Sequence, residues 1–118
     1  MLEDNSEIVA AFALYDSNAG AEQVTWEDAK ESALYIDRLG VNVNYLRKGI
    51  GSVMLRKAIE LTREKYVKYL RLFVVDINEP AIELYEKNGF KKADGIYDEV
   101  VDDNLTLHEY GFEIGTSR

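Results

Sequence analysis

The chain of 118 residues contains no cysteine, one histidine and one proline. Without cysteine the protein has neither a disulfide framework nor a thiolate nucleophile, and the absence of disulfides fits a cytoplasmic protein. The single histidine, His108, argues against a transition-metal site. Because the only proline is Pro80, no proline-rich linker divides the chain, and we expect one domain over residues 1–118.

Long apolar runs and an excess of positive charge are also absent. No stretch approaches the roughly 20 apolar residues of a membrane span, and we see no N-terminal signal peptide, so we expect no membrane partner. Lys and Arg number 14 against 22 Asp and Glu, which gives a net charge of −8. This acidic balance disfavours DNA or RNA as a partner, since nucleic-acid binding normally needs a basic face.

What the sequence does contain is a pattern of strands around two helices. Apolar runs and periodicity predict strands at residues 1–4, 7–15, 34–43, 70–75, 90–93 and 105–114, and helices at 50–66 and 81–88. In the third strand the apolar period slips between Ile36 and Leu39, which predicts a β-bulge. Segment 26–30 is expected to be a helical turn or an open loop with Trp26 exposed, and segment 94–104 an acidic, solvated loop.

The order of these elements predicts the fold class. A strand, a helix and a strand between residues 34 and 75 imply a parallel strand pair joined by a right-handed crossover. The predicted class is α/β (α+β): a mixed sheet with a central parallel strand pair and two flanking helices. For the second helix we expect Asn78 or Glu79 as the N-cap, Gly89 as the left-handed residue after the last turn, and an apolar contact from Phe90.

The first candidate site is the glycine turn Arg47-Lys48-Gly49-Ile50-Gly51-Ser52 before the first helix. Glycines let the backbone approach a ligand closely, and the N–H groups and dipole of a helix start favour an anion such as pyrophosphate. The turn lacks the third glycine of the dinucleotide fingerprint and the Gly-Lys-Ser/Thr of a Walker loop. A tight connection without a ligand remains the alternative.

The second candidate site is Asn78 with Ala81 and Tyr85 on the second helix. Seven residues are nearly two helical turns, so Asn78 and Tyr85 face the same way, with the small Ala81 between them. The alternative is a capping Asn and a half-buried core Tyr. Because both candidate helices follow neighbouring parallel strands, the two candidates are expected to flank one crevice at the carboxyl ends of those strands.

At this point the sequence resembles a known family. Residues 39–52 (LGVNVNYLRKGIGS) look like the acetyl-CoA motif of the GCN5-related N-acetyltransferases, the GNAT family. Residues 78–90 (NEPAIELYEKNGF) look like that family's Asn-x-x-Ala-x-x-x-Tyr-x-x-x-Gly-Phe signature, in the same order and at the same separation. The resemblance covers roughly residues 1–112.

The resemblance implies a function. It implies transfer of an acetyl group from acetyl-CoA, as cosubstrate and without a metal, to a primary amine of a small molecule or peptide. A backbone N–H of Leu39 or Val41 would stabilise the oxyanion, Tyr85 would protonate the departing thiolate, and Asn78 would contact the pantetheine. The residues implied to bind acetyl-CoA are Leu39, Gly40, Val41, Arg47, Lys48, Gly49, Ile50, Gly51, Ser52, Asn78 and Tyr85.

The chain departs from the family in two ways. The family usually has Gln or Arg at the position of Leu46 and Gly at that of Arg47. The family's N-terminal strand and two helices, which wall the acceptor pocket, are also expected to be missing. A truncated chain, a pseudo-domain, or a site completed by another chain such as a homodimer partner would each account for this. A non-catalytic acyl-CoA-binding or regulatory domain is therefore the alternative function.

The general base is not evident from the sequence. Asp37 and Asp76 lie near the relevant strand ends, where each is also readily explained as a solvated charge. His108 is expected to be structural.

Overall fold

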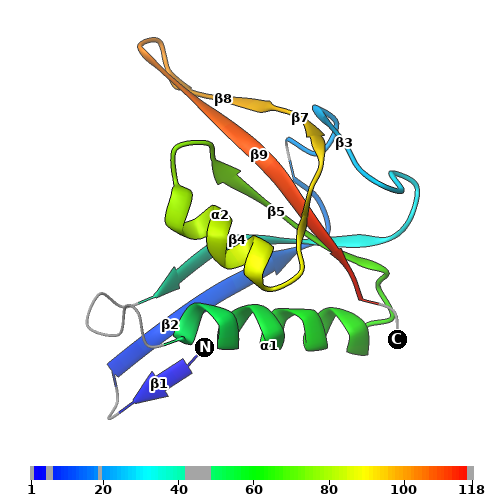
Figure 1. Ribbon diagram of the computed structural model, residues 1–118, viewed down its shortest axis with the longest axis vertical. Helices are drawn as coiled ribbons and strands as arrows, with labels where there is room; N and C mark the ends of the chain where they lie inside the picture. The colour runs from blue at the N-terminus through cyan, green and yellow to red at the C-terminus, as the bar shows by residue number, and fades with distance from the viewer. Residues whose placement is uncertain (1, 5–6, 19, 42–48, 117–118) are drawn as a thin grey trace.

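The computed structural model describes residues 2–4, 7–18, 20–41 and 49–116, and it has the predicted mixed α/β fold (Figure 1). The elements are β1 (Leu2–Asp4), β2 (Glu7–Tyr15), β3 (Val24–Thr25), β4 (Ala33–Val41), α1 (Ile50–Glu64), β5 (Tyr69–Val75), α2 (Glu79–Lys87), β6 (Lys91–Lys92), β7 (Asp94–Gly95), β8 (Tyr97–Asp102) and β9 (Leu105–Gly115). No helix in the described part of the chain is long and apolar enough to cross a membrane.

The strands form one large sheet and one small one. The order in the large sheet is β1-β2-β4-β5-β9-β6, and β8 also pairs with β9. β4 and β5 run parallel, as expected for strands joined through a helix, and the other neighbours are antiparallel. β3 and β7 form a separate two-stranded ribbon.

The predicted β-bulge is confirmed in β4. Ala11 of β2 lies opposite Gly40, whereas Ala13 lies opposite Asp37. Two steps on β2 therefore correspond to three steps on β4, so that one extra residue is accommodated there. The slip of the apolar period in the sequence arises from this insertion, because an extra residue shifts the alternation of faces.

Both helices cover one face of the large sheet, here called the helical face (Figure 1). The core on this face contains the buried residues Ile36, Leu55, Ala58, Leu70, Leu72, Val74, Tyr85, Phe90 and Phe112. Strand residues of even number dominate this set, because alternate side chains of a strand point to opposite faces. α1 contributes a stripe of buried residues to this core, because Leu55, Ala58 and Thr62 recur at helical spacing on one side of the helix.

Each helix ends on a left-handed residue. After α2, Gly89 has φ +90° and Phe90 is buried in the core, as the sequence predicted, and the N–H of Phe90 donates to the carbonyl of Tyr85. After α1 the same motif occurs without glycine, since Tyr66 has φ +59° and the N–H of Val67 donates to the carbonyl of Thr62. Tyr66 is 91% exposed, so no packing against its side chain explains this conformation.

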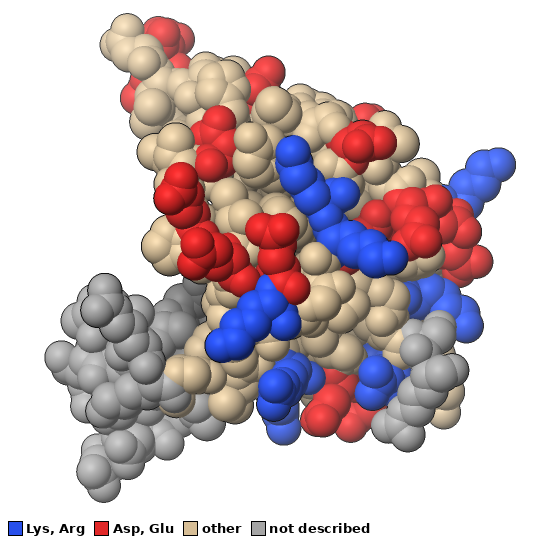
Figure 2. Space-filling model, viewed as in Figure 1, with Lys and Arg blue, Asp and Glu red and all other residues tan. Residues whose placement is uncertain are grey.

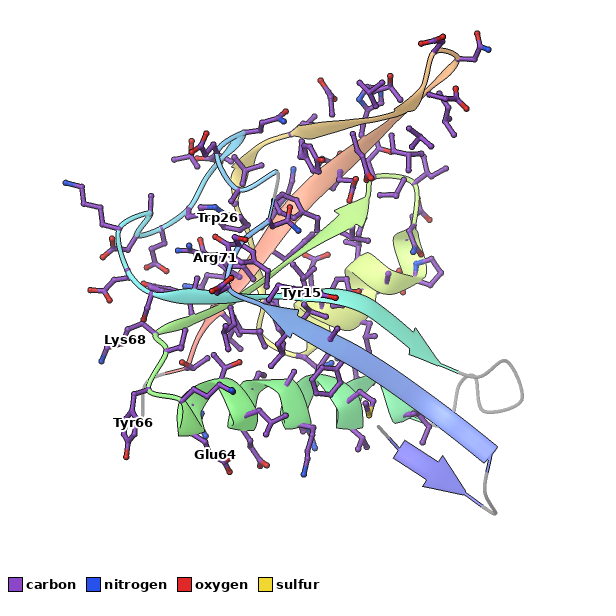
Figure 3. All side chains as sticks on the ribbon, turned by 180° about the vertical axis from the view of Figure 1, so that it is seen from behind. Tyr15, Trp26, Glu64, Tyr66, Lys68 and Arg71 are labelled. Atoms are coloured by element: carbon purple, nitrogen blue, oxygen red, sulfur yellow. The ribbon has the colours of Figure 1, made fainter. Side chains whose placement is uncertain are left out.

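The opposite face of the sheet is here called the rear face, and it carries a second core. Trp26, Tyr35, Val24 and Ala93 are buried there, with Phe73 and Tyr97 packed against them. The Trp26 ring meets that of Phe73 edge-on at 5.6 Å between centroids. The prediction that Trp26 is exposed was therefore wrong: its side chain is 6% exposed and covers the sheet (Figure 3).

A buried ion pair lies beside Trp26. Arg71 of β5 is 1% exposed, and its Nε lies 3.2 Å from Oε1 of Glu113 on β9. Its Nη2 donates to the carbonyl of Asp28, and the other carboxylate oxygen of Glu113 accepts from the N–H of Glu27. Arg71 also stacks on Trp26, at 4.7 Å from the ring centroid. The pair thereby holds the turn around residues 26–30 against the sheet.

The acidic segment 94–104 was predicted to be a loop and is instead largely strand. β7 and β8 lie within it, and Tyr97–Asp102 pairs with β9 from Glu109 to Leu105. The segment gave no strand signal because half of β8 is acidic and most of its residues are exposed, so apolar and polar residues do not alternate along it. β8 forms because β9 is long enough to pair with it. This partner lies outside segment 94–104, so the segment's own sequence does not reveal the strand.

Candidate functional site

The central parallel pair loses its pairing toward the carboxyl ends of its strands. The β4–β5 register runs from Ala33 opposite Tyr69 to Ile36 opposite Leu72. β4 continues to Val41 and β5 to Val75, and Figure 1 shows the two strands diverging beyond the paired part. We call these diverging ends, residues 37–41 and 73–75, the strand opening. Ligands of open α/β sheets bind outside such carboxyl ends.

The amino end of α1 is suited to an anion. Gly49 precedes the helix with φ +73°, and in the described part of the chain no side chain caps the helix start. The first turn of α1 contains no acidic residue. The N–H groups of Ile50, Gly51 and Ser52 have no partner within the helix, because the first turn of any α-helix leaves them free. An anion at this end would be bound by these donors and by the helix dipole.

The two glycines of the turn have different roles. A Cβ on Gly49 would meet no atom within 4 Å in the described structure, so this position needs glycine for its left-handed backbone. A Cβ on Gly51 would lie 2.8 Å from Cδ2 of Leu84. Gly51 therefore allows α1 and α2 to approach one another, and its predicted contact with acetyl-CoA stays a prediction.

The second candidate set is divided between surface and core. Asn78 is exposed and caps α2, its Oδ1 accepting from the N–H of Ala81 at 3.4 Å. Tyr85 is 9% exposed and lies between Phe90 and Phe112, with ring centroids 6.0 and 6.1 Å away. Burial raises the pKa of Tyr85 above the ordinary 10.0, so the phenol keeps its proton at neutral pH. The contacts predicted for these residues with acetyl-CoA stay predictions.

Several predicted residues are described only in part. Arg47 and Lys48 lie outside the described residues, as does Leu46. Leu39, Gly40 and Val41 are placed as backbone of β4 within the strand opening. Of the turn, Gly49, Ile50, Gly51 and Ser52 are described and lie together at the start of α1.

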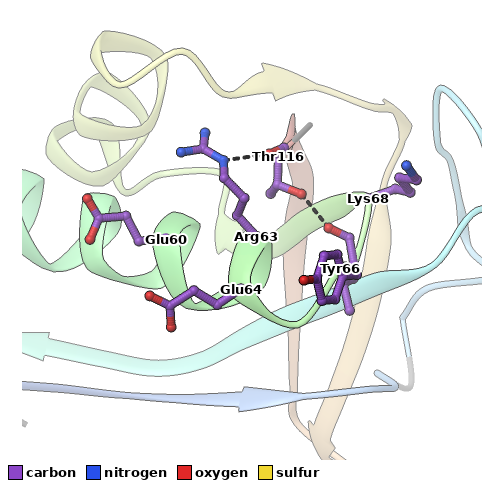
Figure 4. A pocket seen from close by; sticks show the side chains of 7 residues that line it. Glu60, Arg63, Glu64, Tyr66, Lys68 and Thr116 are labelled. Atoms are coloured by element: carbon purple, nitrogen blue, oxygen red, sulfur yellow. Dashed lines mark hydrogen bonds between the residues drawn. The ribbon is translucent and has the colours of Figure 1, made fainter. Parts of the chain in front are cut away.

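A hollow of about 840 Å³ lies elsewhere, at the carboxyl end of α1 (Figure 4). Arg63 donates from Nε to the carbonyl of Thr116 at 2.8 Å, and the Thr116 hydroxyl donates to the carbonyl of Val67. A helix of 15 residues is about 22 Å long, so this hollow is remote from Gly49 at the other end. Its exposed wall of Glu64, Tyr66 and Lys68 includes none of the predicted site residues.

His108 lies on the exposed part of the β8–β9 hairpin. Its Nδ1 is 2.6 Å from Oδ1 of Asp98, and the two side chains are 56% and 58% exposed. The hydrogen bond with Asp98, followed by the charge of Asp98, raises the pKa of His108 above 6.5, and Asp76 adds a smaller effect. Among the described residues, Figure 2 shows acidic and basic side chains interspersed over the helical face.

Comparison with known proteins gives the family. The sequence model of the Acetyltransferase (GNAT) family matches residues 1–90 of this chain. This chain belongs to the GNAT family. Its match extends over most of the sequence, including both the glycine turn and the second helix.

Two curated relatives and one solved structure illustrate the similarity of this GNAT chain. Streptothricin acetyltransferase of Streptomyces lavendulae is 33% identical over 82 residues, which are 70% of this chain and 38% of that protein. Spermine/spermidine N(1)-acetyltransferase of Bacillus subtilis is 35% identical over 66 residues, 55% of this chain and 43% of that protein. The chain thus spans less than half the length of these relatives.

The solved structure supports the fold. A GNAT family acetyltransferase from Elizabethkingia anophelis with acetyl-CoA bound superimposes with a TM-score of 0.70 at 18% identity. The match covers 96% of this GNAT chain and 72% of that protein.

Sequence reasoning overlooked two charged residues of this GNAT chain. Arg71 is a lone basic residue within the apolar run 70–75, and Glu109 is an acidic residue in the last strand with 8% exposure. A charge inside a buried strand is uncommon unless it is partnered, and that is the signal that could have identified both. The partner of Arg71, Glu113, comes from another strand, so only the fold shows what this arginine meets.

Proposed function

We propose that this GNAT chain binds acetyl-CoA and transfers its acetyl group to a primary amine. The observation that carries the proposal is the early end of the β4–β5 pairing, beside the uncapped start of α1. Acetyl-CoA has a diphosphate that suits free amides at a helix start, and its pantetheine arm is long and thin enough to lie between diverging strands.

The chemistry requires an uncharged amine and a stabilised oxyanion. An ordinary alkylamine has a pKa of about 10.4 and must lose a proton before it attacks the thioester. The carbonyl oxygen then gains charge, and a backbone N–H of Leu39 or Val41, in the strand opening, stabilises it. Tyr85 supplies a proton to the departing thiolate. Its buried, protonated phenol supports this assignment, since a donor must hold its proton until the thiolate forms.

The acceptor is an amine of a small molecule or peptide. The relatives above are named for streptothricin and for spermine and spermidine, which are amines. The same proposal includes a cytoplasmic location, because a chain without cysteine needs no oxidising compartment. It also includes a homodimer, for which edge strand β8 with the exposed Val100 and Val101 is the expected contact.

Two measurements, made one after the other, test the proposed function. Calorimetric titration of the protein with acetyl-CoA should give saturable heat, and its absence would remove the proposal. A free-thiol assay with spermidine, lysine, an aminoglycoside and a peptide N-terminus should then show CoA release with at least one amine. Binding without thiol release for any amine would assign an acyl-CoA-binding role instead.

A further inference from the structure

The carboxyl end of α2 lies against the first turn of α1. Nδ2 of Asn88 donates to Oγ of Ser52 at 3.1 Å, and a Cβ on Gly51 would lie 2.8 Å from Cδ2 of Leu84. Two positions of α2, one turn apart, thus contact the second and third residues of α1. The amides that the start of α1 leaves free are therefore bordered by the last turn of α2.

Lys87 is the last residue of α2, and helix geometry determines the side on which it lies. At about 100° per residue, Lys87 is about 60° from Leu84 in one direction, and Tyr85 is about 100° from Leu84 in the other. Tyr85 is part of the core, and Leu84 contacts α1. Lys87 therefore lies on the solvent side of the contact between the helices, beside the start of α1, and its side chain is exposed.

The ammonium group of Lys87 has no carboxylate partner in the described structure. Glu83 stands four residues earlier, in the order that favours an ion pair along a helix. The two ion pairs between described residues nevertheless involve neither of these side chains. The first turn of α1 contains no acidic residue either. In a chain of net charge −8, an unpaired cation therefore borders the free amides of α1.

We propose that Lys87 binds the diphosphate of acetyl-CoA, beside the amides of α1. This rests on the proposed function and makes it more specific, because it gives the chain a means of distinguishing acetyl-CoA from an acetyl thioester of pantetheine alone. A helix start supplies roughly half of one positive charge, which leaves most of the charge of a diphosphate unbalanced. The amides of α1 are fixed in direction, whereas the flexible stem of Lys87 lets its charge follow the phosphate oxygens.

The test uses two matched lysine variants. Lys87→Met removes the charge and keeps the length of the stem, and Lys65→Met makes the same change at the exposed carboxyl end of α1. In calorimetry at low salt, we expect Lys87→Met to raise the Kd of acetyl-CoA about fivefold and Lys65→Met to raise it less than about twofold. Lys87→Arg should keep most of the affinity. The difference between Lys87→Met and the wild type should shrink as salt is added.

Two further ligands show which group Lys87 contacts. Acetyl-dephospho-CoA lacks the 3′-phosphate and keeps the diphosphate, so Lys87→Met should weaken its binding as much as that of acetyl-CoA. S-acetylpantetheine has no phosphate, and its Kd, from nuclear magnetic resonance titration, should be the same for Lys87→Met and the wild type. A lysine that only offsets the dipole of α2 would not distinguish these ligands.

The outcomes separate this inference from the proposed function. An unchanged acetyl-CoA Kd in Lys87→Met, or an equal loss in Lys65→Met, would overturn the inference and leave acetyl-CoA binding intact. A loss that disappears with acetyl-dephospho-CoA, or that also occurs with S-acetylpantetheine, would overturn the assignment to the diphosphate. Circular dichroism of each variant reports folding, and we expect the wild-type spectrum. Failure of the wild-type protein to bind acetyl-CoA would instead remove the proposed function.

Discussion

The side chain of Asn88 donates a hydrogen bond from Nδ2 to Oγ of Ser52 at 3.1 Å, and this bond joins the end of α2 to the first turn of α1. The same Nδ2 donates to the carbonyl of Leu84 at 2.8 Å. One amide therefore ties together the two helices that carry the proposed acetyl-CoA contacts.

The Asn88–Ser52 bond should matter for both stability and binding. We expect Asn88→Ala to lower the free energy of unfolding by about 1 kcal/mol and to weaken acetyl-CoA binding, because α1 would lose a restraint at its amino end. Urea unfolding and calorimetry measure the two effects. A double-mutant cycle with Ser52→Ala isolates the bond, and strictly additive losses would show that it contributes nothing.

The two ends of α1 offer a matched pair of backbone tests. Gly49 and Tyr66 both have left-handed φ values, +73° and +59°. Gly49→Ala should destabilise the protein by about 1–2 kcal/mol because a Cβ disfavours that conformation, whereas Tyr66→Gly should stabilise it by up to about 1 kcal/mol. Urea unfolding distinguishes the signs. Gly115→Ala, at an exposed glycine without a left-handed φ, is the control for Gly49→Ala and should be nearly neutral.

Gly49 should also matter for the cosubstrate. We expect Gly49→Val to weaken acetyl-CoA binding, since a side chain there alters the turn that precedes the free amides of α1. Calorimetry on the folded variant measures this. An affinity equal to that of the wild type would refute the placement of the pyrophosphate at this turn.

Tyr85→Phe should lower turnover more than acetyl-CoA affinity, because the ring packing is kept and only the proton donor is removed.

Tyr85 also predicts a pH effect on stability. Its folded pKa is raised above 10.0, so the contribution is full below pH 10 and is lost as the pH rises through the folded value. The wild type should therefore lose more stability than Tyr85→Phe in urea unfolding above pH 10. If the wild type and Tyr85→Phe lost equal stability above pH 10, the raised pKa of Tyr85 would be contradicted. In the activity assay, unchanged turnover of Tyr85→Phe would exclude Tyr85 as the proton donor.

Arg71→Ala should be strongly destabilising. It leaves the Glu113 carboxylate buried without its cation and frees the carbonyl of Asp28, at a cost of about 3–5 kcal/mol. The turn that this pair holds should also become open to limited proteolysis. Arg71→Met with Glu113→Met removes both charges, and its unfolding free energy should lie closer to the wild type than that of Arg71→Ala. A double variant as unstable as the single one would show that packing, not charge, is lost.

His108 can be titrated as the only imidazole in the chain. Nuclear magnetic resonance should give a pKa above 6.5, and Asp98→Asn should lower it by removing the partner of Nδ1. A raised folded pKa means that the pair contributes fully below pH 6.5 and is lost as the pH rises through the folded value. Asp103→Asn removes a charge from the adjacent turn and should move the pKa much less. Equal shifts in both variants would mean that general charge, not the hydrogen bond, raises it.

The sequence was most informative where local chemistry determines structure. The bulge between Ile36 and Leu39, the capping Asn78 and the left-handed Gly89 are each specified by neighbouring residues, and all three are confirmed. The boundaries of α1 and α2 differ from prediction by at most two residues at each end.

The errors have the opposite cause, since they concern residues whose environment comes from far along the chain. Trp26 is buried because Gly111 on β9 leaves space for its ring, and the predicted loop 94–104 forms strand because β9 extends to meet it. Glu109 gains its place beside the strand opening only through the β5–β9 register. No pattern within a local window carries these relationships.

The inserted residue in β4 limits how this strand can change length. Peptide groups point alternately to the two neighbours of a strand, so the insertion decides which amides turn toward β2 and which toward the strand opening. Removing a single residue would exchange the two sets and, beyond the deletion, would also exchange the two side-chain faces of the strand, so it should yield an inert protein. Removing two would keep the direction of every donor. Natural insertions and deletions that preserve activity in this strand should therefore come in even numbers.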